Sequence, residues 1–580
     1  MNFLMGNELI AIGAYHSGVT SAYAYPGTPS SEILEAYSHY AKGCYSQWSI
    51  NEKIAFELAA AEAISGKFAM CSMKQVGLNV AADPLFSVAY TGVKGALIIV
   101  SADDPGPYSS QTEQDSRMYA FSAKIPVFDP INPVDAYELT KKGVELSHKF
   151  EIPVMIRPVM RVCHSRQSFD IQVEKSEYNY GNFEKDVSRW AATPKYRKVL
   201  HAKLNEKLEI ISSTYYQNYK INRKNKFAVV GSGYSFAIVM DIVKEKKLDI
   251  DLYKFDMSFP LPAALLDELI NRYEKILVIE ETQPLIEIQF ARKDKIFGRL
   301  NDFITKMGEL TYDYLTEKLF NFIGKEFKIN KNQDFKAKGV KPRLCPGCGH
   351  RPAFYAIKKV AKNKGIFPGD IGCYTLGVNL DAVDTCICMG ASVTFAEGLS
   401  RSNPEKTIIA TIGDSTFFHT GIPALINAVI NDAKFVLCIL DNETTAMTGF
   451  QPVPHESGKI KIEKVVEGIG IEFCKVVDPY KFEEGIKVLE EAVSFVESNR
   501  KPAVVVYRHP CVTKIKYRKK NDVVITDDCR NCRICYEKFE CPAIFENKLK
   551  NKAEIDRLIC VNCGVCISVC PFNAIVRNSE

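Results

Sequence analysis

Short apolar runs alternate along the first 180 residues with stretches whose apolar positions recur at helical spacing. Residues 95–100 and 152–157 form two of these runs, and both are far too short to span a bilayer. Runs of this length between helical stretches predict buried strands. The alternation is typical of an α/β layer fold, which we expect over residues 1–180.

The pattern changes and then returns further along the chain. Residues 175–226 are polar with helical periodicity and few strand signals. Residues 227–230 then predict a strand, 234–247 a helix and 276–280 a second strand, which together indicate a small α/β domain. Gly231 and Gly233 lie in the turn, but the third glycine of a dinucleotide-binding fingerprint is missing, so NAD binding is disfavoured here.

A third α/β region follows a lysine-rich connector at residues 325–341. Its strands are predicted at residues 407–412 and 435–440. A basic stretch at residues 514–520 then precedes a cysteine-rich tail, and we interpret it as a solvated hinge. The predicted division of the chain is 1–180, 181–335, 336–513 and 521–580.

Composition excludes several classes of protein. The 580 residues are 46% apolar and 25% charged, which is ordinary for a globular protein. A net charge of +5 from 74 basic and 69 acidic residues predicts neither a nucleic-acid nor a membrane surface. The first eight residues lack the basic start and long apolar core of a signal peptide. The 19 cysteines, most of them in metal-like spacings, favour a reducing cytoplasm and predict sensitivity to oxygen.

The tail contains two runs of four cysteines. They read Cys529-x2-Cys532-x2-Cys535-x5-Cys541-Pro and Cys560-x2-Cys563-x2-Cys566-x3-Cys570-Pro. The second matches the bacterial ferredoxin run, in which three thiolates hold one [4Fe-4S] cluster and the fourth reaches to the other. Zinc ribbons and disulfides are alternatives, but the first need paired CxxC ligands and the second suit small secreted domains.

This spacing predicts the ligands of two clusters. We expect one cluster to be held by Cys529, Cys532, Cys535 and Cys570, and the other by Cys560, Cys563, Cys566 and Cys541. The x5 gap before Cys541 departs from the usual x3, and we expect it to enlarge a loop and leave ligation intact.

A second motif joins the ends of two predicted strands. Gly413-Asp414-Ser415 follows one strand, and Asp441-Asn442 follows the next after 25 intervening residues. Ligands of α/β sheets bind at the carboxyl ends of strands, and this layout is that of a thiamine diphosphate motif. The diphosphate is bound through Mg²⁺, a cation that prefers oxygen ligands. We expect Asp414, Asn442 and the backbone carbonyl of Thr444 to supply them, with Gly413 turning the backbone beside the diphosphate. Ser415 and Asp441 replace the glycine and asparagine of the usual motif, which leaves a cofactor-free pair of loops as an alternative.

Thiamine diphosphate also needs a carboxylate beside its aminopyrimidine ring, in a domain that faces the diphosphate domain. Glu52 and Glu57 lie where a predicted strand runs into a helix in the first domain. The helix dipole would keep Glu52 ionised, which alone explains no more than helix capping. Its position at the start of the helix makes Glu52 the candidate.

The chain resembles the 2-oxoacid:ferredoxin oxidoreductases over nearly its whole length, and within them the large, alpha subunits that act on indolepyruvate. The motifs that carry the resemblance are Tyr25-Pro-Gly-Thr-Pro-Ser-Ser-Glu32, Asn51-Glu-Lys53, Val76-Gly-Leu-Asn-Val-Ala-Ala-Asp-Pro84, Asp103-Asp-Pro-Gly-Pro107, Cys345-Pro-Gly-Cys-Gly-His350, Gly369-Asp-Ile-Gly-Cys-Tyr-Thr-Leu-Gly377, Cys388-Met-Gly-Ala-Ser392 and Gly413-Asp-Ser-Thr-Phe-Phe-His419. An irregular first ferredoxin run is characteristic of such subunits.

The resemblance implies a fold for each part of the chain. It implies a multidomain α/β protein with two doubly wound parallel sheets of the thiamine diphosphate type. Residues 1–180 would bind the aminopyrimidine and 336–513 the diphosphate and Mg²⁺. Residues 181–335 would form a helical connector and a small α/β domain like the transketolase C-terminal domain, and 521–580 an α+β ferredoxin domain with two [4Fe-4S] clusters.

Site residues are also carried over by the resemblance. Glu52 matches the glutamate that contacts the aminopyrimidine. Cys345, Cys348, Cys373 and Cys511 resemble the ligands of a third, proximal [4Fe-4S] cluster, with buried packing thiols as the alternative. Cys373, Gly390 and His419 are further candidates for contact with the cofactor, and His419 is equally compatible with a structural role.

The resemblance implies oxidative decarboxylation of an aryl 2-oxoacid with coenzyme A, giving an aryl-acetyl-CoA, CO2 and reduced ferredoxin. Because the gamma-like small subunit of the family has no counterpart in this chain, a smaller partner chain is expected, in a heterotetramer of two large and two small subunits. Three alternatives stay open: another 2-oxoacid as substrate, such as pyruvate or a branched-chain one; a non-oxidative thiamine decarboxylase; and an electron-transfer scaffold with a vestigial thiamine site.

Overall fold

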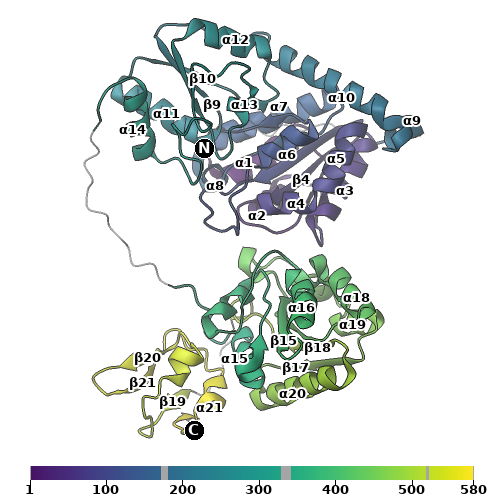
Figure 1. Cartoon of the computed structure of the whole chain (residues 1–580), viewed down its shortest axis with the longest axis vertical. Helices are drawn as coiled ribbons and strands as arrows, with labels where there is room; N and C mark the ends of the chain where they lie inside the picture. The colour runs from purple at the N-terminus through teal and green to yellow at the C-terminus, as the bar shows by residue number, and fades with distance from the viewer. Residues whose placement is uncertain (1, 172–180, 328–340, 517–521, 579–580) are drawn as a thin grey trace. The chain divides into compact units, whose positions relative to one another are not determined.

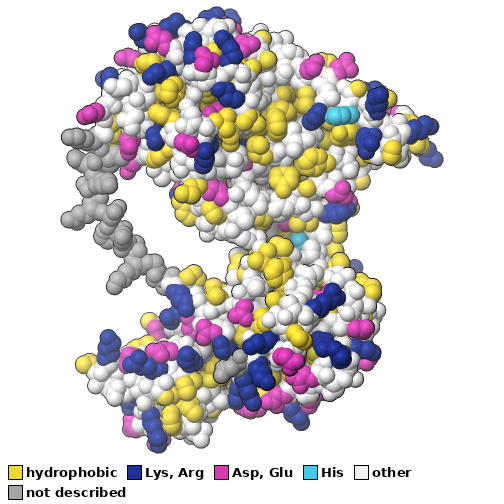
Figure 2. Space-filling model, viewed as in Figure 1, with side chains coloured by type: hydrophobic (Ala, Val, Ile, Leu, Met, Phe, Trp, Pro, Cys, Tyr) yellow, Lys and Arg dark blue, Asp and Glu magenta, His cyan; other side chains and the backbone are white. Residues whose placement is uncertain are grey.

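The computed structural model describes residues 2–171, 181–327, 341–516 and 522–578, and the chain forms two compact units, Met1–Phe335 and Lys336–Glu580 (Figure 1). The stretch 172–180 and most of the connector and the basic linker lie outside the described residues. Among the described residues, every helix is too short or too polar to cross a membrane. Lysine and arginine side chains are interspersed with acidic ones on the face drawn in Figure 2.

A seven-stranded sheet forms the centre of unit 1. Its order is β11 (Met257–Phe259), β6 (Val127–Phe128), β7 (Val154–Ile156), β5 (Ala96–Ala102), β4 (Phe68–Lys74), β2 (Ser21–Ala24) and β3 (Tyr45–Trp48). All neighbours are parallel except β11 and β6. Every residue of β5 is buried, as expected for a parallel sheet covered on both faces.

Two groups of helices cover this sheet. The helix α1 (Gly6–His16) packs against α2 (Ser31–Tyr40) and α7 (Pro133–Phe150). The helix α3 (Glu52–Ile64) packs against α4 (Gln75–Val80) and α5 (Ala82–Thr91), which contacts α6 (Ser116–Ala123) and α10 (Pro194–Tyr215). A short antiparallel pair, β1 (Asn2–Met5) and β8 (Arg166–Phe169), lies beside α8 (Met160–His164), while α9 (Val187–Trp190) precedes α10.

A smaller parallel sheet completes unit 1. Its order is β10 (Ile250–Lys254), β9 (Phe227–Gly231), β12 (Lys275–Ile279) and β13 (Ile296–Phe297), with helices α11 (Gly233–Lys246), α12 (Ala263–Arg272), α13 (Leu285–Gln289) and α14 (Tyr312–Phe322). The strand β11 follows β10 in the chain but pairs with β6 of the large sheet. The segment that forms the small sheet therefore also contributes an edge strand to the large one, which the sequence pattern does not predict.

Buried charges also join the two sheets. The Arg117 guanidinium is fully buried and pairs with Asp115 at 2.7 Å, Asp129 at 3.2 Å and Glu280 at 3.1 Å. The carboxylates follow strands of both sheets, since Asp129 comes after β6 and Glu280 after β12. A second buried guanidinium, Arg157, pairs with Asp103 at 2.7 Å. The arginine network is defined here as Arg117, Arg157, Asp103, Asp115, Asp129 and Glu280.

A five-stranded parallel sheet forms the body of unit 2. Its order is β14 (Gly365–Ile366), β15 (Thr407–Gly413), β16 (Val436–Asp441), β18 (Ala503–Arg508) and β17 (Phe473–Val477). Alternate residues of β16 point into two separate cores, Cys438 and Leu440 into one, Leu437 and Ile439 into the other. The helices α15 (His350–Ala361) and α20 (Phe482–Asn499) pack together, and α16 (Ala391–Ser402), α18 (Ile422–Ile430) and α19 (Ile462–Ile469) form the second group. This doubly wound arrangement confirms the predicted fold class.

The tail of unit 2 contains two antiparallel strand pairs and a short helix. The strand β19 (Val523–Ile525) pairs with β22 (Ile575–Arg577), and β20 (Ile544–Asn547) pairs with β21 (Lys552–Ile555). The helix α21 (Val565–Val569) lies within the second cysteine run and carries Cys566. The core of this region is small, and cysteine side chains make up much of it.

Candidate functional site

The sheet of unit 2 places two aspartates side by side. The neighbouring parallel strands β15 and β16 pair Gly413 with Leu440, so the residues that end them lie at the same edge. Oxygens of Asp414 and Asp441 and a ring nitrogen of His455 lie within 4.8 Å of one another. This group could hold a metal ion, and the loop that contributes His455 follows β16.

The two aspartates differ in how their charges are compensated. Asp441 contacts His455 Nε2 at 2.9 Å and accepts a hydrogen bond from Arg508 Nε at 2.6 Å. Burial acts to raise the pKa of Asp441, but the interactions with His455 and Arg508 outweigh it and lower that pKa. In Asp414, Oδ1 accepts a hydrogen bond from the backbone of Ser415 at 2.9 Å, whereas the buried Oδ2 accepts no hydrogen bond among the described residues and lies 3.7 Å from His455 Nε2. Burial and the adjacent Asp441 raise the pKa of Asp414 to about 8. The site therefore has an acid that a divalent cation would stabilise.

The loop after β16 folds back over the motif. The Asn442 carbonyl accepts a hydrogen bond from Cys511 N at 3.1 Å. Thr444 is buried, and its carbonyl accepts from Ala446 N at 3.0 Å, which leaves that oxygen a second lone pair. The side chain of Thr445 donates to Ser415 Oγ at 3.2 Å. The loop thus brings the predicted ligands Asn442 and Thr444 to the edge that carries Asp414.

A second loop of this edge is organised by Asp370, which lies in the motif at residues 369–377. Its buried carboxylate accepts from the backbone N–H of Gly390 at 3.0 Å and of Ser392 at 3.1 Å. Burial raises the pKa of Asp370 to about 6. Gly390 has φ of 85°, and a Cβ there would collide with Thr420, whose hydroxyl lies 3.3 Å from the ring of the buried His419.

Gly413 also has a steric reason to be glycine, since a Cβ there would overlap the ring of Tyr374. The Tyr374 hydroxyl hydrogen-bonds Thr416 Oγ1 at 2.6 Å. The residues at this edge are therefore packed closely around a backbone turn.

Four cysteines of the body converge beside the same edge. Burial raises the pKa of the Cys348 thiol to about 12, and Cys373 and Cys345 act on it in the same direction. Burial raises the pKa of Cys373 to about 11, with further contributions from Cys345, Cys511 and Asp414. The fold thus brings together the four residues that the family resemblance pairs with a third cluster.

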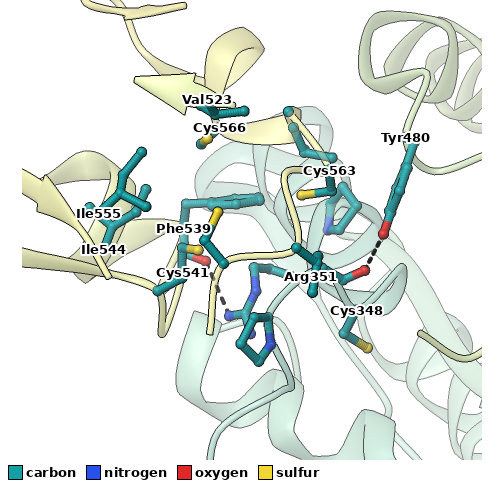
Figure 3. A pocket seen from close by; sticks show the side chains of 18 residues that line it. Cys348, Arg351, Tyr480, Val523, Phe539, Cys541, Ile544, Ile555, Cys563 and Cys566 are labelled. Atoms are coloured by element: carbon teal, nitrogen blue, oxygen red, sulfur yellow. Dashed lines mark hydrogen bonds between the residues drawn. The ribbon is translucent and has the colours of Figure 1, made fainter. Parts of the chain in front are cut away.

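The eight tail cysteines separate into two groups. Cys529, Cys532, Cys535 and Cys570 line one cavity, and Cys541, Cys560, Cys563 and Cys566 line another (Figure 3). These are the two sets that the spacing predicts. In the x5 gap, Cys541 N donates to the Cys535 carbonyl at 3.1 Å across a widened helical turn, residues Ile534–Lys538.

Glu52 lies in unit 1, at the start of α3 and after the carboxyl end of β3. The Asn51 side chain caps the helix by accepting from Ile54 N at 2.9 Å. Glu52 is 6% exposed, and a Cβ on Gly77 of α4 would collide with its carboxylate. Because Gly77 has no side chain, the Glu52 carboxylate can pack directly against the backbone of α4.

Sequence reasoning missed three residues of unit 2: His455, Arg508 and Asp370. Asp370 was findable, because it sits in a glycine-rich motif at a sheet edge. His455 and Arg508 carry no local signal, since their roles depend on contacts with Asp441 across the fold.

Comparison with family models divides the chain in the same way. Residues 12–220 match the model described as pyruvate flavodoxin/ferredoxin oxidoreductase, thiamine diP-bdg. Residues 370–507 match the thiamine pyrophosphate enzyme C-terminal TPP binding domain. Residues 553–576 match a 4Fe-4S binding domain.

Curated relatives match nearly the whole chain. Indolepyruvate oxidoreductase subunit IorA of Archaeoglobus fulgidus is 38% identical, over 99% of this chain and 97% of its own length. The IorA subunit of Thermococcus kodakarensis is 39% identical, over 98% and 96%. Among solved structures, a 2-oxoglutarate:ferredoxin oxidoreductase from Magnetococcus marinus is 14% identical with a TM-score of 0.45, over 56% of this chain and 65% of that one. From its relatives and its domains, the chain belongs to the family of indolepyruvate oxidoreductase IorA subunits, as a 2-oxoacid oxidoreductase subunit with a thiamine diphosphate domain and a 4Fe-4S domain.

Proposed function

We propose that this chain is the catalytic subunit of a ferredoxin- and coenzyme A-dependent oxidative decarboxylase of aryl 2-oxoacids, with indolepyruvate as the type substrate. The products would be an aryl-acetyl-CoA, CO2 and reduced ferredoxin. The observation that carries the proposal is the buried Asp414 oxygen, which accepts no hydrogen bond among the described residues, beside four converging cysteines. The aryl preference is inferred from the relatives, which are indolepyruvate oxidoreductase subunits.

The donor set fits Mg²⁺ and a diphosphate. Asp414, Asn442 and the Thr444 carbonyl would supply oxygen ligands to Mg²⁺. Gly413, Ser415, Gly390 and His419 would contact the cofactor. When bound, thiamine diphosphate supplies the electron sink for decarboxylation.

Glu52 would hold a proton at the aminopyrimidine ring of the cofactor, and Gly77 leaves the space in which its carboxylate lies. In unit 2, Asp441 holds His455 by a hydrogen bond of 2.9 Å. We assign His455 and Arg508 the task of neutralising Asp441, so that Asp414 remains the acid available to the metal.

Three [4Fe-4S] clusters would carry the electrons away. Cys345, Cys348, Cys373 and Cys511 would hold the first, and the two tail sets would hold the others. Clusters of this kind reach the low potentials that suit ferredoxin as acceptor. Coenzyme A enters as co-substrate.

The proposed assembly contains a second, smaller chain with a gamma-like domain, in a heterotetramer of two large and two small subunits. The domain boundaries remain predictions, at residues 1–180, 181–335, 336–513 and 521–580. The cytoplasmic location is also a prediction, based on the number and spacing of the cysteines.

Anaerobic turnover with the purified partner chain tests the function. Several 2-oxoacids are supplied with coenzyme A, and viologen reduction and acyl-CoA are measured together. We expect indolepyruvate and related arylpyruvates to outperform pyruvate and branched-chain substrates. Free aldehyde without a CoA ester would instead identify a non-oxidative decarboxylase.

The third cluster has its own test. Cys511→Ala should lower the iron content from about twelve to about eight atoms per chain, the difference of one [4Fe-4S] cluster. Cys474→Ala is the matched control, because Cys474 lies in β17, away from the ligand sets. Equal iron in both variants would return the four body cysteines to structural thiols.

A further inference from the structure

The ferredoxin tail docks on the body of unit 2 through the enlarged loop before Cys541. Phe539, in the x5 gap, packs edge-on against Tyr355 of α15 with ring centroids 5.5 Å apart. Gly347, in the loop between Cys345 and Cys348, has φ of 75°, and a Cβ there would overlap Val561 of the second cysteine run. The extra residues of the gap thus form part of the contact between the body and the tail.

Arg351 is the charged side chain at the centre of this contact. It belongs to the first turn of α15 and is 2% exposed. Its Nη1 donates to the carbonyl of Glu540 at 2.5 Å, and Nη2 donates to the carbonyls of Leu344 and Cys345. The fork of one guanidinium therefore ties the loop of the body cysteines to the loop of the tail cysteines, a geometry that lysine cannot reproduce.

The surroundings of Arg351 are two sets of sulfurs. Figure 3 shows its side chain extending toward the Cys541 loop, in the cavity that Cys348 also lines. The guanidinium interacts electrostatically with Cys541 and Cys348, and then with Glu540 and Cys563. Its Nε is buried and has no hydrogen-bond partner among the described residues.

Glu540 does not cancel this cation by a direct ion pair. Its Oε1 lies 3.4 Å from Lys341 Nζ and 3.7 Å from Arg343 Nε, both on exposed side chains, and its Oε2 is buried without a hydrogen bond among the described residues. Arg351 contacts the carbonyl of Glu540 instead. A buried cation therefore faces the cavity that carries Cys541, Cys560, Cys563 and Cys566.

Resting on the cluster assignments proposed above, we propose that Arg351 is a positioning residue for electron transfer: its fork fixes the gap between the body cluster and the Cys541 cluster, and its charge raises the reduction potential of the latter. Reduction adds an electron to the cluster, and a nearby positive charge in a low-dielectric region stabilises that added negative charge. The Cys541 cluster would then be a better acceptor for electrons arriving from the body.

The two parts of the role are separable by two substitutions. Arg351→Gln removes the charge and most of the fork, whereas Arg351→Lys keeps the charge and loses the fork. Lys358→Gln is the control, because Lys358 lies on the same helix, is half-exposed and contacts Asp381. Each full-length protein is titrated anaerobically and followed by the electron paramagnetic resonance of its reduced clusters, whose mutual broadening reports the distance between them.

We expect Arg351→Gln to lower the equilibrium constant for one-electron reduction of one tail cluster at least tenfold, which is about 59 mV. Arg351→Lys should keep that equilibrium constant within about threefold of the unsubstituted protein but weaken the magnetic coupling between clusters. Lys358→Gln should change neither quantity.

Unchanged potentials in an iron-replete Arg351→Gln protein would overturn the charge effect. Should this variant lose iron, Arg351→Lys decides: full coupling there would overturn the positioning role, and a shifted potential would overturn the charge effect. Absence of cluster signals in the unsubstituted protein would overturn the cluster assignments themselves, together with this inference.

Discussion

Two sheet edges of this molecule bury acidic side chains in opposite ways. In unit 1, Asp115 and Asp129 share the fully buried Arg117, and Asp103 pairs with Arg157. In unit 2, Arg508 and His455 compensate Asp441, but Asp414 keeps a buried oxygen that accepts no hydrogen bond among the described residues. Both edges lie at the carboxyl ends of parallel strands, where ligands bind.

This difference in charge compensation distinguishes acids that stabilise the fold from an acid that is available to bind a ligand. A buried ion pair with good geometry holds its elements in place, and removing one partner is costly. A buried acid with an oxygen that accepts no hydrogen bond is unstable by itself and gains stability when a cation binds. Charge compensation, and not burial or location, therefore distinguishes the arginine network from the proposed Mg²⁺ site.

The largest effect is expected at Asp414. Asp414→Ala removes the carboxylate ligand of Mg²⁺, so thiamine diphosphate should dissociate, with binding at least about a hundredfold weaker by calorimetry. The iron content should stay intact. Asp441→Asn is the matched control, because it removes the compensated acid and creates an Asn-Asn pair; equal loss of binding in both variants would contradict the comparison.

The second prediction concerns Glu52, a buried acid of unit 1 that does not belong to the arginine network. Glu52→Gln should leave the cofactor bound but slow the turnover of every substrate about a hundred- to ten-thousand-fold, as loss of a general acid–base group does. Hydrogen–deuterium exchange at the thiazolium carbon measures the step directly. Glu57→Gln, on the same helix but with a half-exposed side chain, should leave the exchange rate unchanged. Unaltered exchange in Glu52→Gln would refute the role.

The arginine network should matter for stability. Arg117→Met leaves three carboxylates without their shared partner, and we expect the free energy of unfolding of unit 1 to fall by about 3–5 kcal/mol in urea titrations. Arg161→Met, which breaks a half-exposed pair with Glu309, should cost less than about 1 kcal/mol. A network variant as mild as this control would show that the buried charges are dispensable.

The smallest effect concerns pH. Burial raises the pKa of Glu281, next to the network, from 4.5 to about 7. Between these values the folded state binds a proton that the unfolded state has lost, so stability is present below pH 4.5 and declines as the pH rises to about 7.

Thermal unfolding across this pH range measures the decline, which we expect to be about 1–3 kcal/mol. Glu281→Gln retains the acceptor for Leu310 N and does not titrate, so its decline should be smaller. Glu274→Gln, in an exposed pair with Lys226, should follow the unsubstituted protein. An identical slope in Glu281→Gln would assign the pH dependence to other groups.

Much of the fold was predictable because its signals are local. The strands predicted at residues 227–230 and 407–412 lie within β9 and β15. The two groups of tail cysteines followed from their spacing, since a tight loop presents neighbouring sulfurs to one cavity.

Contacts between distant segments were not predictable in this way. His455 and Arg351 act through side chains and carbonyls far along the chain, and no periodicity marks either residue. The three residues of β11 are too few to give a strand pattern, and their partner β6 lies some 130 positions earlier.

That strand has a consequence for how the protein folds. Because β11 closes the sheet beside β6, a fragment ending near residue 180 would expose the backbone of β6 as an open edge, which favours intermolecular pairing. The arginine network also links the two sheets of unit 1, through the pair between Arg117 and Glu280. Residues 1–180 and 227–325, which look like separate modules in the sequence, should therefore melt in one cooperative calorimetric transition.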